Sequence, residues 1–82
     1  MTPVERYIGE ALQDRGLIGL SVSISIDHRK NLTHFATFDM LGHQIDVYDA
    51  YGQVDICTLQ DVDFVAHQIE TRLRKKYNRR ID

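Results

Sequence analysis

The sequence predicts a single α+β domain with the element order helix, three or four antiparallel strands, helix. Apolar residues recur with helical spacing near both ends of the chain and alternate with polar residues in the middle. Length is the third indication, because 82 residues suffice for one hydrophobic core only. We therefore expect one domain over residues 1–82, in which the strands form a meander sheet and both helices cover one face of it.

The first helix is predicted for about residues 3–15. Thr2 is a favourable N-cap, Pro3 suits the first helical position, and Glu5 stands where it can close a capping box. An apolar stripe follows and ends before Gly16, a residue suited to a left-handed C-cap. The stripe consists of Val4, Tyr7, Ile8, Ala11 and Leu12.

The first strand is predicted for residues 20–26, where apolar residues and serines alternate strictly. Successive side chains of a strand point to opposite faces, so one face of this strand is apolar and the other carries the serines. We expect the apolar face to join the helices in the core. The predicted core comprises Leu12, Leu20, Val22, Ile24, Ile45, Val47 and Ile69.

Two further strands are predicted for residues 32–39 and 44–48, each after a polar or glycine-containing turn. Residues 49–52 are predicted to form a hairpin turn, because they end in a glycine able to adopt positive φ. This turn leads to a short fourth strand over residues 53–57. The middle of the chain thus predicts three long strands and one short strand.

The second helix is predicted to begin near Thr58 and to run into the C-terminal tail. Asp61 and Asp63 lie near its start, where acidic side chains favour a helix. Its apolar positions are Val62, Val65, Ala66, Ile69, Leu73 and Tyr77. At about 1.5 Å per residue this helix is roughly 30 Å long, so its far end should extend past the edge of a small sheet.

Charge is divided unevenly along the chain. Before Arg72 there are four basic and eleven acidic side chains, a net charge of −7, whereas the segment from Arg72 to Asp82 has six basic side chains and one acidic, a net charge of +5. The basic helix end and tail, residues 72–82, could contact nucleic-acid phosphates, contact an acidic partner, or simply complement the helix dipole. The six basic residues are Arg72, Arg74, Lys75, Lys76, Arg79 and Arg80.

The face of the sheet opposite the helices is predicted to bind a protein. We expect it to show Ser21, Ser23, Ser25, Thr33, Phe35, Thr37, Asp46, Tyr48 and Asp55. Aromatic anchors among polar groups are typical of binding surfaces, so the predicted contact residues are Phe35, Tyr48, Ser23 and Asp46. Two alternatives stay open: Phe35 belongs to the core while Phe38 faces outward, or a second copy of the chain covers this face.

No catalytic, cofactor or metal site is predicted. His28, His34, His43 and His67 do not have the spacing of metal ligands, and the single cysteine, Cys57, has no paired ligand motif. A lone cysteine also excludes an internal disulfide and suits a reducing compartment. Because no apolar run approaches the roughly 20 residues that span a bilayer, we expect a cytoplasmic protein without a membrane partner.

These observations favour a non-enzymatic protein that occupies a surface of a larger protein or complex. Small accessory and inhibitor proteins of phages and mobile elements have the same profile. One alternative is a nucleic-acid-binding or regulatory protein that uses the basic helix end, and another is a homodimeric structural module. The predicted element order resembles that of the double-stranded RNA-binding domain, but that family has lysines at the start of its second helix, where this chain has Asp61 and Asp63.

Overall fold

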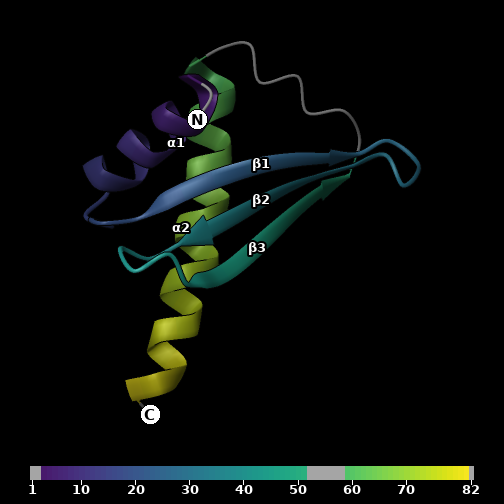
Figure 1. The fold of residues 1–82 in the computed structure, drawn as a ribbon. Helices are drawn as coiled ribbons and strands as arrows, with labels where there is room; N and C mark the ends of the chain where they lie inside the picture. Colours follow the sequence, from purple (N-terminus) through teal and green to yellow (C-terminus); the bar gives the residue numbers. More distant parts are fainter. Residues whose placement is uncertain (1–2, 52–58, 82) are drawn as a thin grey trace.

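The computed structural model describes residues 3–51 and 59–81, and in the second helix it describes the side chains of residues 61–77. It confirms the α+β class and the meander (Figure 1). One antiparallel sheet has the strand order β1-β2-β3, and the predicted fourth strand lies outside the described residues. The elements are α1 (Pro3–Asp14), β1 (Ser21–Asp27), β2 (Leu32–Phe38), β3 (Gln44–Tyr51) and α2 (Leu59–Ile81).

The ends of two elements illustrate how local sequence fixes the boundaries. Helix α1 stops where Gly16 adopts a φ of 88°, and the N–H groups of Gly16 and Leu17 bond back to the carbonyls of Gln13 and Leu12, both at 3.0 Å. This pair of hydrogen bonds forms the left-handed C-cap that the glycine predicts. The hairpin turn predicted for residues 49–52 is wrong for residues 49–51, because β3 pairs with β2 through residue 51.

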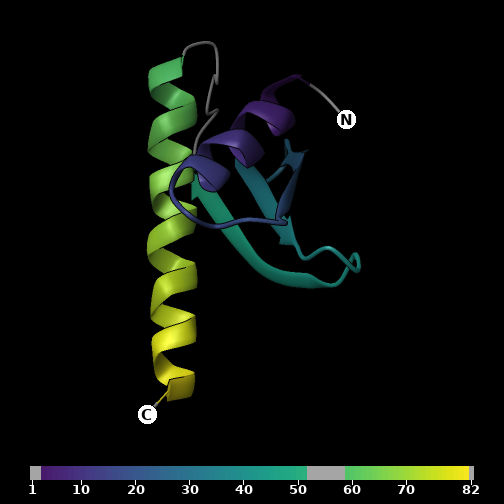
Figure 2. The ribbon, with the colours of Figure 1, turned by 90° about the vertical axis from the view of Figure 1, so that its left-hand side faces the viewer.

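Both helices lie on one side of the sheet, and the yellow C-terminal part of α2 extends beyond it (Figures 1 and 2). The space between helices and sheet is the hydrophobic core. Its buried members are Ile8, Leu12, Val22, Phe35, Ala50, Val62, Val65, Ala66, Ile69 and Leu73. Leu73 is the last buried residue among the described side chains of α2, and those of residues 74–77 are exposed.

The register between β1 and β2 places side chains differently from the prediction. Val22 pairs with Thr37 and Ile24 with Phe35, so the odd-numbered residues of β2 share the helix-facing side with the even-numbered residues of β1. The serines of β1 lie on the opposite face, as predicted. Val47 is the exception among the predicted core residues, because it pairs with Ala36 on the face away from the helices.

Side chains from the two helices occupy both edges of the sheet. At the β1 edge, the Glu5 carboxylate accepts the N–H of Ile24 at 2.6 Å. At the β3 edge, Arg72 donates to the carbonyl of Val47 at 3.1 Å and Lys76 donates to the carbonyl of Ile45. Unpaired edge groups are sites where another strand can add, and charged side chains are a common protection. We call these contacts the edge seals.

Candidate protein-binding surface

Three large apolar side chains are exposed on two loops that meet at one end of the sheet. Ile18 is 75% exposed, Met40 83% and Leu41 81%. Ile18 belongs to the connection between α1 and β1, whereas Met40 and Leu41 belong to the turn between β2 and β3. The two segments touch, because a Cβ added to Gly19 would lie only 2.8 Å from the Met40 side chain. We call Ile18, Met40 and Leu41 the apolar tip.

The turn that carries Met40 and Leu41 is held by one carboxylate. Asp39 Oδ1 accepts the N–H of Leu41 at 2.9 Å and the N–H of His43 at 2.8 Å. The backbone adds a bond from the N–H of Asp39 to the carbonyl of His43 at 3.0 Å, and another from Gly42 to Asp39 at 3.1 Å. The bond from the His43 N–H is the main reason that the pKa of Asp39 lies below its usual value.

This lowered pKa gives the turn a defined pH dependence. A carboxylate whose pKa is depressed by folding stabilises the fold above its unfolded value of about 3.9, and this contribution is lost as the pH falls through the folded value. We therefore expect the protection factors of the Leu41 and His43 amides, the ratio of intrinsic to observed exchange rate, to be lower in acid than near pH 5, measured by hydrogen exchange with NMR detection. In Asp39→Asn, which keeps an acceptor oxygen without this titration, the acid-induced change at both amides should be absent.

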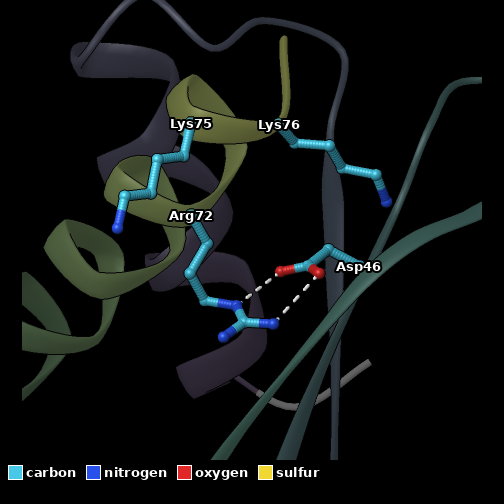
Figure 3. Close-up of a pocket in the computed structure, with 4 residues that line it drawn as sticks. All are labelled: Asp46, Arg72, Lys75 and Lys76. Carbon is cyan, nitrogen blue, oxygen red and sulfur yellow. Dashed lines mark hydrogen bonds and ion pairs between the residues drawn. The ribbon is translucent and has the colours of Figure 1, made fainter. Parts of the chain in front are cut away.

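A second feature lies where α2 passes β3. Arg72, Lys75 and Lys76 from α2 and Asp46 from β3 line an open cleft of about 340 Å³. Arg72 donates to both carboxylate oxygens of Asp46, at 2.7 and 3.2 Å, and this hydrogen bonding raises the pKa of Arg72 (Figure 3). The ammonium group of Lys75 points away from Asp46. We call these four residues the basic cleft.

The basic residues predicted as contacts differ in whether their side chains already bind other parts of the protein. Arg72 and Lys76 bind the edge of β3, and Arg74 donates to Glu70 at 3.0 Å and to the carbonyl of Arg15 at 2.9 Å. Lys75 has no bonded partner among the residues that the structure describes. The predictions for Arg79 and Arg80 concern side chains outside those described.

The four residues predicted to bind a protein do not share a surface. Phe35 is fully buried and stacks on Tyr48, with ring centroids 5.8 Å apart and an interplanar angle of 23°. The prediction that Phe35 faces solvent is therefore wrong, and its alternative, a core Phe35, is confirmed. Tyr48 and Asp46 are half-buried on the same helix-facing side, whereas Ser23 is exposed on the other face.

The face away from the helices has a mixed character. His34 and Asp49 pair across the strands there, with Nδ1 and Oδ1 2.5 Å apart. Tyr51, at its end, is 86% exposed. The register places Ser21, Ser23, Ser25, His34, Ala36, Phe38, Val47, Asp49 and Tyr51 on this open face. A partner covering it would have to desolvate the His34–Asp49 pair, which costs free energy unless the pair keeps its hydrogen bonds.

Sequence reasoning missed the apolar tip, although a signal was present. Ile18 lies between two glycines of the α1–β1 connection, and Met40 and Leu41 directly precede Gly42. Large apolar residues in such turns are unusual, because the backbone there runs over the surface and leaves their side chains in water. Apolar residues within predicted turns were therefore better candidates for contacts than the aromatic residues within predicted strands.

The described residues include no group of three or more histidine, cysteine, aspartate or glutamate side chains that could hold a metal ion. Within the same ranges, no helix has the length and apolar character needed to cross a membrane. Comparison of the chain with protein-family models, curated proteins and solved structures found no match. The candidate surface is thus defined by the geometry of this chain alone.

Proposed function

We propose that this protein is a non-enzymatic binding module that occupies a surface of a larger protein or complex, with the apolar tip as its anchor. The observation that supports this most is the Asp39 turn, which holds Met40 and Leu41 more than 80% exposed. Burial of apolar surface stabilises a fold by roughly 25 cal/mol per Å². These exposed side chains contribute no such stabilisation to this fold. A partner gains from it, because a preorganised anchor loses little conformational entropy on binding.

The proposal extends to the kind of protein and its location. Accessory and inhibitor proteins of phages and mobile elements are short and act stoichiometrically, and the length and composition of this chain support membership of that functional class. A cytoplasmic location is part of the proposal. The single cysteine, Cys57, supports it, because one cysteine forms no internal disulfide.

Leu41→Ser is expected to weaken partner binding by about tenfold or more, which corresponds to about 1.4 kcal/mol. The thermal midpoint should hardly change, because the Leu41 side chain is 81% exposed. The measurement is capture of a protein from nuclease-treated lysate on the immobilised wild type, followed by titration of the captured protein against each variant.

Two matched variants sharpen this test. Phe64→Ser changes a side chain that is 58% exposed on α2, away from the tip, and should bind as the wild type does. Tyr51→Ser changes the open face. Loss of binding in Tyr51→Ser with full binding in Leu41→Ser would show that the open face, not the tip, is the anchor.

A nucleic-acid-binding protein is the second candidate. The extension of the basic end of α2 beyond the sheet favours it, together with Tyr77, which is 42% exposed and could stack on a base. Against it, Arg72 and Arg74 already pair with Asp46 and Glu70. Titration of the protein with an oligoglutamate peptide and with a DNA duplex separates the two candidates.

A further inference from the structure

We propose that the basic cleft binds a carboxylate-bearing segment of the protein partner. This inference rests on the proposed function, since it names the chemistry that the partner presents beside its contact with the apolar tip. Three features support it: the net charge of the cleft, its free hydrogen-bond donors, and the position of Asp46 on the β2–β3 hairpin.

Charge in the cleft is unbalanced. Three cations and one carboxylate line the cleft, which gives its lining a net charge of +2. The carboxylate, that of Asp46, already accepts two N–H groups of Arg72, so the charges of Lys75 and Lys76 are the ones left over. An anionic group entering the cleft thus meets uncompensated positive charge.

The donors that remain are suited to a carboxylate. The ammonium group of Lys75 keeps all three donors free of partners among the described residues, and Lys76 has used one donor on the carbonyl of Ile45. Lys76 and Arg72 are held by the backbone of β3. A ligand that uses them therefore has less side-chain entropy to remove than it would with free surface lysines.

The cleft and the tip each include residues of the β2–β3 hairpin. Leu41 and Asp46 are five residues apart, and at about 3.3 Å per residue the separation is at most roughly 17 Å. A standard protein interface covers about 800 Å² per partner, so one partner can contact both features. The expected partner surface has an apolar pocket for Met40 and Leu41 and acidic side chains next to it.

A nucleic-acid strand fits this cleft less well than a short acidic segment does. The chain before Arg72 has a net charge of −7, and Asp46 itself lies in the cleft. A long polyanion must pass along this acidic body, whereas an acidic side chain enters the cleft alone. Electrostatic complementarity therefore selects carboxylates on a folded partner.

The test uses three probes and the intact protein: an oligoglutamate peptide, an oligoglutamine peptide of the same length, and a DNA duplex. Each is titrated by NMR at about 50 and 200 mM salt, the range in which phosphate contacts lose orders of magnitude in affinity. Lys75→Gln is the cleft variant. Lys30→Gln is the matched control, because it removes the same charge from the turn between β1 and β2, at the other end of the sheet.

We expect salt-sensitive binding of oligoglutamate with chemical-shift changes at Lys75 and Lys76, and none with oligoglutamine. Lys75→Gln should weaken this binding about two- to fivefold, the range of an exposed ion pair, while Lys30→Gln leaves it unchanged. Tighter binding of the duplex than of oligoglutamate at both salt concentrations would overturn the proposal in favour of nucleic acid. Absence of binding at the lower salt would overturn it as well and leave the cleft a structural contact.

A negative result in the oligoglutamate titration can be distinguished from failure of the proposed function. Leu41→Ser should bind oligoglutamate as the wild type does, because the tip is not part of the cleft. If Leu41→Ser loses the captured protein while oligoglutamate does not bind to the wild type, the tip remains the anchor and only the acidic character of the partner is wrong.

Discussion

Phe35→Ala is expected to lower the free energy of unfolding by about 3 to 5 kcal/mol, the usual loss for a large aromatic side chain removed from a core. Phe35 has no exposed surface and lies at the centre of the sheet, between Ile24 and Tyr48. Its stacking on Tyr48 adds roughly 0.5 to 1.5 kcal/mol beyond buried area. The free energy of unfolding of a small domain is only about 5 to 15 kcal/mol, so the variant should be partly unfolded at physiological temperature. Urea denaturation followed by circular dichroism measures this loss.

Phe38→Ala is the matched control, because Phe38 belongs to the same strand but points to the open face. It is half-buried, so its loss should be clearly smaller than that of Phe35→Ala. Equal losses in the two variants would contradict the observed register between β1 and β2.

Glu5→Ala is expected to lower the free energy of unfolding by about 1 to 3 kcal/mol, the cost of leaving a partly buried donor without its acceptor. The donor is the N–H of Ile24, which bonds Glu5 Oε2 at 2.6 Å, and the Glu5 side chain is itself buried. Glu5 also lies in the first turn of α1, where a negative charge is favourable. Urea denaturation gives the stability, and light scattering over a concentration series gives the association state.

Two variants control this experiment. Glu10→Ala removes an exposed carboxylate of the same helix, whose pairing with Arg6 at 3.8 Å contributes at most about 0.5 kcal/mol. Glu5→Gln keeps an acceptor oxygen and should recover most of the stability lost in Glu5→Ala. A Gln variant as unstable as the Ala variant would show that the charge of Glu5, not its hydrogen bond to Ile24, is what matters.

The element order was readable because each element carries a local signal. The cap residues of α1, the serine alternation of β1 and the apolar spacing of α2 act within a few residues of each other, and all three elements appear near the predicted bounds. Strand β3 extended further than predicted because the residues of β2 that pair with it are far away in sequence. A turn signal at residues 49–51 does not end a strand while a paired neighbour is available.

The assignment of faces failed because it depends on the number of residues in a turn. Four residues, 28–31, separate β1 from β2. With an even number, odd-numbered residues of one strand lie opposite even-numbered residues of the next, so Phe35 joins Ile24 in the core. The prediction combined odd-numbered residues of both strands, which placed Phe35 with the serines. Thr37 and Asp46 do share a face, as predicted, because they pair across β2 and β3, but that face is the helix-facing one and Thr37 is buried there.

The way the tip and the cleft are each assembled from separate segments could not be predicted, for a different reason. The contact of Gly19 with Met40, and that of Arg72 with Asp46, each join segments that only the finished fold brings together. An acidic partner was one of three alternatives for the basic end, and in the fold Arg72 pairs with Asp46 of the same chain. Among the basic side chains of α2 that the structure describes, Lys75 is the one without a bonded partner there, which follows from the direction in which it leaves the helix and not from the charge count.

The edge seals also limit how the protein can assemble through its sheet. Glu5 protects one edge and Arg72 with Lys76 protects the other, so the two protections come from different helices and have opposite charge. A substitution that removes the protection by Glu5 leaves one unpaired strand edge. Two such molecules can pair through these edges and form a closed dimer. Endless growth of a ladder requires both edges to open. Any single substitution at these seals therefore leads to a closed pair of molecules at most, and a fibre requires independent changes in α1 and α2.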